Sequence, residues 1–161
     1  MELITERLVI NKFTESDKEP WWQIEKNFEV RKYINQKPLS RVEAANYVSA
    51  AIESYVINGY GRYAVRDIAN LKLIGMCGFL LDEMGIDFGY RYCPTSWGRS
   101  IAYEAAKAVF YFGTKTLGLS PVVAGVHPKD YASESILKKL GFHFHSEVNF
   151  MDQKFLKYEF H

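Results

Sequence analysis

The segment from Asp87 to Ala105 contains the residue types in this chain that could do chemistry. An aromatic-rich run leads into a turn of small residues around Gly98 and Ser100, and a helical pattern follows at once. The first turn of a helix leaves several backbone N–H groups without a partner and with partial positive charge, and small side chains let a phosphate approach them. The segment therefore predicts a pyrophosphate-binding turn, although in isolation such a turn more often holds glycine and serine for helix capping alone.

The composition narrows the functions that this turn can serve. Of 161 residues, 48% are hydrophobic and 24% are charged, which is typical of a globular protein, and we expect a single domain over residues 1–161. The 20 basic and 19 acidic residues give a net charge of +1, whereas nucleic-acid binders usually carry a basic excess. We therefore expect no nucleic-acid partner.

No part of the sequence is typical of a membrane or secreted protein. Its apolar runs are shorter than about 18 residues, the length that a membrane span needs, and the segment Met1–Arg7 lacks the apolar stretch of a signal peptide. The two cysteines, Cys77 and Cys93, are interpreted as small buried hydrophobic residues rather than a disulfide or zinc framework. The four histidines form no pair with obvious metal geometry. We expect a cytoplasmic protein with no metal site and no membrane partner.

Hydrophobic periodicity and capping residues predict the elements before this turn. Leu3 to Phe13 is predicted to be one strand. Two helices follow, one opening at Thr14–Asp17 and the other opening at the capping box Ser40–Glu43 and running to about Ile57. Polar turns then separate three strands of an antiparallel meander, at Tyr60–Arg66, Leu71–Leu81 and Ile86–Tyr92.

After Pro94 the apolar spacing becomes that of a helix, which is predicted to close at Leu117-Gly118. The remaining elements are a strand, a helix and two more strands, at Pro121–Val126, Asp130–Leu140, Phe142–Phe150 and Lys154–Phe160. This order predicts an α+β (mixed α/β) fold, with a single twisted, mostly antiparallel sheet flanked by helices. The helical crossover should place the strands containing Ile86 and Pro121 parallel and adjacent.

A family resemblance is carried by the turn itself, which reads Trp97-Gly98-Arg99-Ser100-Ile101-Ala102-Tyr103-Glu104-Ala105. This run resembles the W-G-K-G-Y-A-x-E-A stretch of the GNAT superfamily of N-acetyltransferases, and looks most like the branch of the ribosomal-protein N-terminal (alanine/serine) acetyltransferases. Further matches follow in family order at Thr5-Glu6-Arg7-Leu8, Glu15-Ser16-Asp17, Leu73-Ile74-Gly75, Asp87-Phe88-Gly89-Tyr90, Val126-His127-Pro128-Lys129-Asp130-Tyr131-Ala132-Ser133 and Lys138-Lys139-Leu140-Gly141-Phe142. The likeness covers nearly the whole chain.

The resemblance implies the GNAT fold, with a central pair of parallel strands that part into a V, and acetyl-CoA as the cosubstrate. The pantetheine arm would lie in the gap and hydrogen-bond to strand backbone at Tyr90, Arg91 and Tyr92. Asp130 and Ser133 would lie beside this arm. The pyrophosphate would rest on the N–H groups of Trp97, Gly98, Arg99, Ser100, Ile101 and Ala102.

Two residues depart from the family pattern. Ser100 stands where the second glycine of the turn is usual, and a left-handed backbone there would strain serine by about 1 kcal/mol or more. We therefore expect Ser100 to lie already in the first turn of the helix, with its hydroxyl able to donate to a phosphate. Asp130 replaces an asparagine and so loses an amide donor, and its alternative role is to cap the following helix.

Acetyl transfer needs a neutral amine. Near pH 7.4, deprotonating a lysine costs roughly 4 kcal/mol, whereas an α-amine costs less than about 1 kcal/mol. Asp87 matches the acidic residue of the family strand and is the candidate general base, directly or through water, with backbone amides of the same strand as oxyanion donors. Ser133 matches a serine that protonates the departing thiolate, and Leu137 occupies the place of the tyrosine acid of many other GNAT enzymes. The alternatives are a solvated strand-edge residue for Asp87 and a helix-surface hydroxyl for Ser133.

Together these features predict an acyltransferase that moves an acetyl group from acetyl-CoA to a primary amine by direct attack, without an acyl-enzyme. The acceptor is a protein N-terminus or a small molecule, and both monomer and homodimer remain open. The alternatives are a catalytically inactive acyl-CoA-binding protein of the same fold and an interaction module without an acyl-CoA site. Trp21 and Trp22 are expected to pack in the core or to border the acceptor pocket, and Glu104 to make a structural contact.

Overall fold

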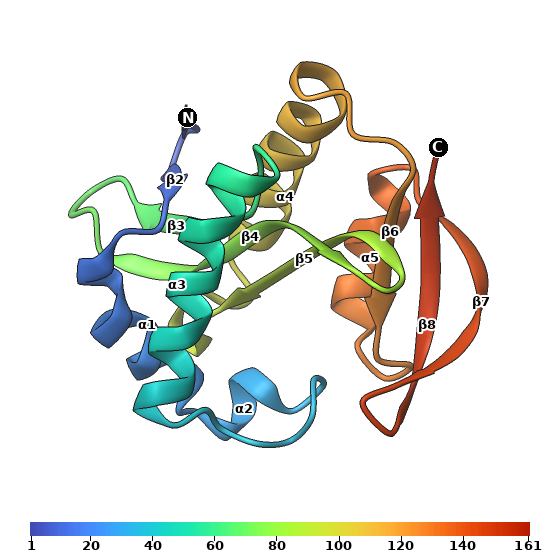
Figure 1. The fold of residues 1–161 in the computed structure, drawn as a ribbon, viewed down its shortest axis with the longest axis horizontal. Helices are drawn as coiled ribbons and strands as arrows, with labels where there is room; N and C mark the ends of the chain where they lie inside the picture. The colour runs from blue at the N-terminus through green and yellow to red at the C-terminus, as the bar shows by residue number, and fades with distance from the viewer.

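An eight-stranded sheet runs through the computed structural model, which describes residues 1–161 (Figure 1). The strands follow the order β1-β2-β3-β4-β5-β6-β8-β7. Their bounds are β1 Glu2–Ile4, β2 Leu8–Lys12, β3 Arg62–Asp67, β4 Leu73–Asp82, β5 Gly85–Tyr92, β6 Val122–Val126, β7 His143–Phe150 and β8 Gln153–Phe160. The predicted α+β architecture with one mostly antiparallel sheet is confirmed.

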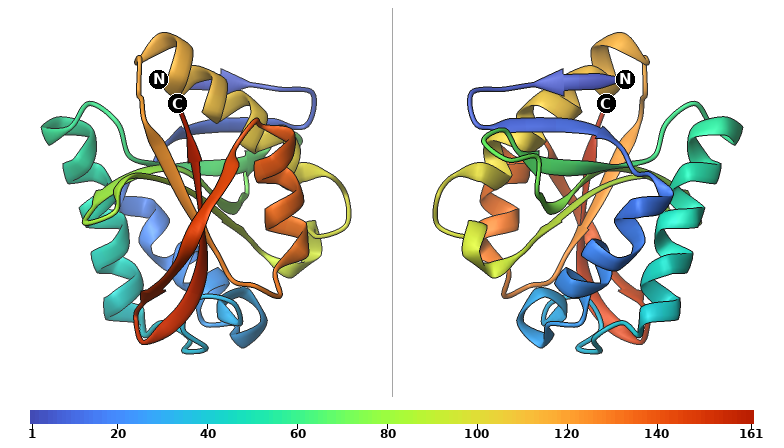
Figure 2. Two further views of the ribbon diagram at one scale, coloured as in Figure 1. Left: turned by 90° about the vertical axis from the view of Figure 1, so that its right-hand side faces the viewer. Right: turned by 90° about the vertical axis from the view of Figure 1, so that its left-hand side faces the viewer.

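Helices cover both faces of this sheet (Figure 2). One face carries α1 (Lys18–Glu25), α2 (Phe28–Arg31) and α3 (Arg41–Ile57), and the other carries α4 (Ile101–Tyr111) and α5 (Tyr131–Lys139). The capping box predicted before α3 is present. The hydroxyl of Ser40 accepts from the N–H of Glu43 at 3.1 Å, and the Glu43 carboxylate accepts from the N–H of Ser40 at 2.9 Å. These reciprocal bonds explain why α3 begins at this point.

Only one pair of neighbouring strands is parallel. β5 and β6 pair at a single position, where Asp87 lies opposite Val123, whereas β5 pairs with β4 along its whole length. Beyond Asp87 the two strands diverge, as Figure 1 shows, so the rest of β5 has no strand on that side. The parallel pair predicted from the helical crossover is confirmed, as is the splay that the family resemblance implied.

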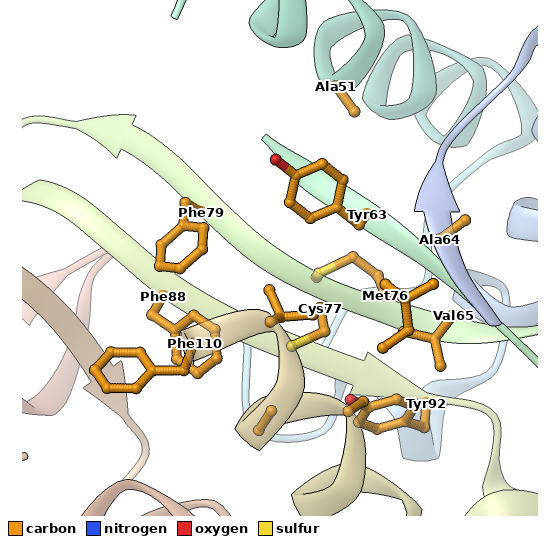
Figure 3. Packing of buried hydrophobic residues seen from close by; sticks show 14 of the residues in the cluster. Ala51, Tyr63, Ala64, Val65, Met76, Cys77, Phe79, Phe88, Tyr92 and Phe110 are labelled. Carbon is orange, nitrogen blue, oxygen red and sulfur yellow. The ribbon is translucent and has the colours of Figure 1, made fainter. Parts of the chain in front are cut away.

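The side chains of β5 alternate between two environments, as expected for a strand. Phe88 and Tyr92 lie on the face that packs toward α4, where the ring of Phe88 lies 5.4 Å from that of Phe110 (Figure 3). Asp87 and Arg91 lie on the opposite face, toward α1 and α3. We call these the aromatic face and the charged face of β5.

The N-terminal segment differs from its prediction, because the single strand expected over Leu3–Phe13 is two strands. The N–H of Thr5 donates to the carbonyl of Leu8 at 2.9 Å, and the bend lets β1 and β2 pair antiparallel. Thr5 and Arg7, at the bend, both donate to the carboxylate of Glu104. This contact joins residues about a hundred positions apart in the chain, so local periodicity carries no sign of the bend.

The helices also differ from their predicted bounds. The first predicted helix consists of a 3-10 turn, Glu15–Asp17, followed by α1, and the short helix α2 has no counterpart among the predictions. The long helix expected after Pro94 consists of a 3-10 turn at Pro94–Ser96, then α4, then a π-helical turn at Phe112–Thr116. Cys77 is buried as expected, whereas Cys93 is half-buried. None of the helices has the length and apolar character that crossing a membrane requires.

Candidate active site

The edge of β5 that faces the gap carries free backbone groups. The N–H of Cys93 donates to the carbonyl of Ile74, near the start of β4, at 2.8 Å. In an antiparallel ladder, residues bonded to one neighbour alternate with residues facing the other side. The N–H and C=O groups of Tyr90 and Tyr92 therefore point toward the gap, while those of Arg91 point toward β4. An extended ligand in the gap would meet both backbone groups of Tyr90 and the N–H of Tyr92, whose carbonyl accepts from the indole of Trp97.

A left-handed backbone at two positions shapes the turn before α4. Gly98 has φ 73°, and Ser100 has φ 60° and ψ 16°. The prediction that Ser100 lies in the first helical turn is therefore wrong: Ser100 is the N-cap residue, α4 begins at Ile101, and the Ser100 side chain makes no capping bond. The chain reverses direction between Trp97 and Ile101, and serine adopts the conformation this requires at a cost of about 1 kcal/mol relative to glycine.

The turn presents a row of unpaired backbone donors. The N–H groups from Gly98 to Tyr103 donate no hydrogen bond within the chain, whereas the N–H of Trp97 donates to the carbonyl of Pro94 at 3.1 Å. The indole of Trp97 donates to the carbonyl of Tyr92 at 3.0 Å and so ties the turn to the end of β5. No heavy atom lies within 4 Å of the Cβ position at Gly98. Unpaired N–H groups at the start of a helix suit a pyrophosphate, so these residues fit that group.

The N-terminal bend fastens this turn from outside. Arg7 donates from Nη1 to the carbonyl of Arg99 at 2.7 Å and from Nε to Glu104 at 2.8 Å. Thr5 donates to the other oxygen of Glu104 at 2.5 Å. Burial raises the pKa of Glu104, but the hydrogen bonds from Thr5 and Arg7 outweigh burial, and the pKa lies below its ordinary value. The structural contact expected of Glu104 is confirmed.

The start of α5 closes the other side of the gap. Asp130 is its N-cap residue, and Oδ1 accepts from the N–H of Ser133 at 3.2 Å. The capping role considered for Asp130 is thus present. The carbonyl of Ser133 accepts from the hydroxyl of Tyr90 at 2.9 Å, which joins α5 to β5. Ser133 is half-buried in the first turn of α5, and its hydroxyl lies beside that of Tyr90.

Asp87 lies on the charged face in a buried ion pair. Its carboxylate is 15% exposed, and Oδ2 accepts from Nη2 of Arg62 at 2.6 Å. Burial raises the pKa of Asp87, and although Arg62 lowers it, the pKa stays above the ordinary value of 3.8. The carboxylate is therefore not the solvated strand-edge residue considered as the alternative. A raised pKa brings a carboxylate closer to the pH at which a general base works well.

Arg62 was not among the residues predicted for the site, and two glycines make room for it. Nη1 of Arg62 donates to the carbonyl of Gly78 at 2.7 Å and to that of Asp87 at 3.2 Å, across three adjacent strands. Gly89 lies beneath the guanidinium, and a Cβ there would lie 2.9 Å from Nη1. Arg62 stands opposite Gly78, and Gly78 opposite Gly89. A glycine in each of two paired strands was the one available signal of a large side chain crossing them.

A second cluster of buried charges lies on the same face. Glu25 of α1 is fully buried, and its Oε1 accepts from Nε of Arg91 at 2.7 Å. The other oxygen of Glu25 accepts from Nη1 of Arg31. Arg31 also donates from Nε to the carbonyl of Lys37 at 2.6 Å. Two arginines thus bind one carboxylate, and nothing local in the sequence signals this arrangement.

Trp21 packs in the core, which was one of the two roles predicted for it. It is fully buried, its ring stacks on that of Tyr47 at 5.2 Å, and the guanidinium of Arg91 lies 5.7 Å from the Trp21 ring and 5.4 Å from the Tyr47 ring. Trp22 is half-buried and donates to the carbonyl of Leu39 at 3.1 Å. The stacked rings form an aromatic support for Arg91.

Comparison with known proteins identifies the sequence family. Residues 7–143 match the family described as the acetyltransferase (GNAT) domain. A curated relative from Bacillus licheniformis, named uncharacterized N-acetyltransferase p20, is 29% identical over 144 residues, which cover 87% of this chain and 81% of the relative. A relative from Bacillus subtilis, named uncharacterized N-acetyltransferase YoaA, is 28% identical over the same shares of both chains.

Solved structures share the fold. An acetyltransferase from Agrobacterium tumefaciens superposes with a TM-score of 0.87 at 20% identity, covering 100% of this chain and 94% of that one. A ribosomal-protein alpha-N-acetyltransferase in complex with coenzyme A superposes with a TM-score of 0.82 at 15% identity, covering 98% and 95% of the two chains. The splayed sheet is therefore shared with acetyltransferases of known structure.

Proposed function

Because this chain belongs to the GNAT acetyltransferase family, we propose that residues 1–161 form one domain that transfers an acetyl group from acetyl-CoA to a primary amine. The observation that carries the proposal is the row of unpaired N–H groups from Gly98 to Tyr103 beside the open edge of β5. A pyrophosphate can accept hydrogen bonds from the row of N–H groups, and an extended arm that contains amides can pair with the open edge of β5. When bound, acetyl-CoA supplies the acetyl thioester.

The cofactor-binding residues divide between the turn and the strand. The N–H groups of Gly98, Arg99, Ser100, Ile101 and Ala102 would hold the pyrophosphate, with Trp97 fixing the turn against β5. Backbone groups of the Tyr90–Tyr92 segment would hold the pantetheine arm, chiefly the N–H and C=O of Tyr90 and the N–H of Tyr92, which face the gap. Asp130 would act by capping α5 and so presenting Ser133 to the arm.

Asp87 would act as the general base. One oxygen is fixed by Arg62, and a carboxylate has further acceptor sites that can take a proton from the amine, directly or through one water. Its raised pKa suits that task. An α-amine has a pKa of about 8, so it is deprotonated at a much lower free-energy cost than a lysine. A protein N-terminus or a similar weakly basic amine is therefore the acceptor that this site fits best.

The departing thiolate needs a proton, and Ser133 would provide it. Its hydroxyl lies beside that of Tyr90, and its backbone is held by Asp130 and Tyr90 on the gap side of α5. Backbone N–H groups of β5 that face the gap would stabilise the oxyanion during direct attack. The reaction would need no covalent intermediate on the protein, and we propose that it takes place in the cytoplasm.

Coenzyme A titration by calorimetry, with a matched pair of variants, tests the proposal. Ala102→Glu places a carboxylate in the first turn of α4, where it suits the helix dipole but repels a pyrophosphate. Tyr111→Glu adds the same charge at the exposed far end of α4. We expect coenzyme A affinity to fall by about tenfold or more in Ala102→Glu and to be unchanged in Tyr111→Glu.

Turnover is tested with a panel of peptides and amines by the release of free thiol from acetyl-CoA. Thiol release with at least one amine is the expected result. A wild-type protein that gives no binding heat and no melting shift with coenzyme A would overturn the proposal. Binding without thiol release from any amine would instead identify a non-catalytic acyl-CoA-binding protein.

A further inference from the structure

Positive charge exceeds negative charge in the buried cluster on the charged face of β5. Three guanidinium groups, of Arg31, Arg62 and Arg91, are joined by ion pairs to two carboxylates, of Glu25 and Asp87. Both carboxylates are engaged, so one positive charge remains uncompensated. A buried charge without a counter-charge is costly, and this excess favours an anionic group as a ligand.

The same face has hydrogen-bond donors without acceptors. Nε of Arg62 and the hydroxyl of Tyr47 are enclosed and have no partner. Arg91 uses Nε and Nη2 on Glu25, whereas its Nη1 makes no bond and is not among the enclosed atoms. Guanidinium groups can only donate, and buried polar groups are almost always hydrogen-bonded. The group that completes this face must therefore be an acceptor.

Tyr47 lies beside Arg91. The Arg91 guanidinium is 5.4 Å from its ring centroid. Burial lowers the pKa of both Arg62 and Arg91, but their carboxylate partners and Tyr47 raise it and prevail. The guanidinium of Arg62 lies over Gly89, which is two residues before Arg91 on the charged face of β5. The three unpaired donors thus belong to one region of the charged face, alongside Asp87.

We propose that these donors bind a carboxylate of the acceptor, so that the substrate is a peptide N-terminus with an acidic side chain at its second or third position. The inference rests on the proposed function, because it assumes that the acceptor amine lies beside Asp87. Asp87 and Arg91 are four residues apart on one strand, which separates their Cα atoms by about 13 Å. The amine and carboxylate of a free α-amino acid are too close together to reach both, whereas an extended peptide spans the distance.

Acetylation of matched peptides tests the inference. The peptides share an N-terminal serine and carry Glu, Gln or Lys at the second or third position, and kcat/KM is measured for each. We expect the Glu peptide to exceed the Gln peptide by about tenfold to a hundredfold, the difference that a charge-assisted hydrogen bond makes. The Lys peptide should be the poorest substrate.

Three variants locate the effect. Tyr47→Phe removes a hydroxyl that has no partner in the chain, so it should leave the melting temperature unlowered while reducing the Glu-to-Gln ratio severalfold. Arg91→Met should bring the ratio close to one, and Glu25 keeps Arg31 as its partner in that variant. Arg41→Met, which removes an exposed arginine elsewhere, should leave the ratio unchanged.

The outcomes separate this inference from the proposed function. Equal turnover of the Glu and Gln peptides would overturn the inference and leave acetyl transfer intact. Faster turnover of free amino acids than of acidic peptides would also overturn it. A Tyr47→Phe variant that melts at a lower temperature with an unchanged ratio would assign the hydroxyl a structural role and count against the inference. Absence of thiol release from every amine would remove the proposed function itself.

Discussion

Two aspartates, Asp17 and Asp87, are each bound by an arginine, yet their pKa values move in opposite directions. Arg66 donates to both oxygens of Asp17, at 2.8 Å each, and the N–H of Thr14 donates at 2.8 Å. Burial raises the pKa of Asp17, but these bonds outweigh burial, and the pKa falls below 3.8. Arg62 engages only one oxygen of Asp87, so burial prevails there and the pKa is raised.

An arginine partner therefore does not by itself decide whether the pKa of a buried carboxylate is raised or lowered. The balance between the number of donors and the loss of water decides it. Asp17 has both oxygens occupied and is suited to holding η1 (Glu15–Asp17) against β3. Asp87 keeps one oxygen free of Arg62. Because its pKa is raised, protonating Asp87 costs less free energy than protonating an ordinary aspartate. Asp17 is therefore suited to stabilising the fold, and Asp87 to the proton transfer that we propose for it.

Asp87→Asn should give the largest effect on activity. General base catalysis contributes about a hundredfold to ten-thousandfold, so kcat/KM should fall by that factor while the melting shift caused by coenzyme A stays. Asp17→Asn serves as the matched control and should keep kcat/KM within about twofold, measured well below its melting temperature. Equal losses of kcat/KM in the two variants would show that the aspartates do not have different roles, because both would then be structural or both catalytic.

Asp17→Asn should instead give the larger effect on stability. It leaves the half-buried guanidinium of Arg66 without a counter-charge, so the free energy of unfolding should fall by about 2 kcal/mol in denaturant titrations. Because the folded-state pKa of Asp17 is lowered, its contribution is present above the ordinary pKa of 3.8 and is lost as the pH falls through the lower folded value. If the difference in stability between the wild type and Asp17→Asn did not decrease at the lowest pH, the stabilising role of the ionised Asp17 would be wrong.

Gly89→Ala should give the smallest of these effects, by acting on Asp87 through Arg62. The added Cβ would lie 2.9 Å from Nη1 of Arg62 and would displace the guanidinium. We expect kcat/KM at neutral pH to fall by about tenfold, the equivalent of one charge-assisted hydrogen bond. The base works ionised, so activity falls as the pH falls through its pKa. Loss of Arg62 raises that pKa further, so the acid limb of the pH–kcat/KM profile should move to higher pH. An unmoved limb would show that Arg62 does not tune Asp87.

The parts of the fold that follow from local patterns could be predicted from the sequence. The capping box at Ser40–Glu43 predicted the start of α3, and the helical crossover before Pro121 predicted that β5 and β6 would be parallel. The turn before α4 was recognisable because glycine and small residues preceded a strong helical period. In each case the determining residues lie within a few positions of the feature they determine.

The features that escaped prediction depend on residues far apart in the chain. The bend between β1 and β2 is fixed by Glu104, and the pKa of Asp87 depends on Arg62, 25 residues away. Glu25 and Arg91 are 66 residues apart. Ser100 is a different case, because serine rarely adopts positive φ and its type pointed to the wrong conformation. Pairing between strands, rather than spacing along the chain, assembles the charged face.

The single backbone pairing between Asp87 and Val123 divides the sheet into sub-sheets of unequal size, β1–β5 and β6–β8. Few hydrogen bonds resist a change in the angle between them, because the ladder is continuous within each part and almost interrupted at their junction. In the proposed complex, an arm bonded along the free edge of β5 and contacting α5 would brace this hinge. Binding of acetyl-CoA would then also fix the angle between the two sub-sheets.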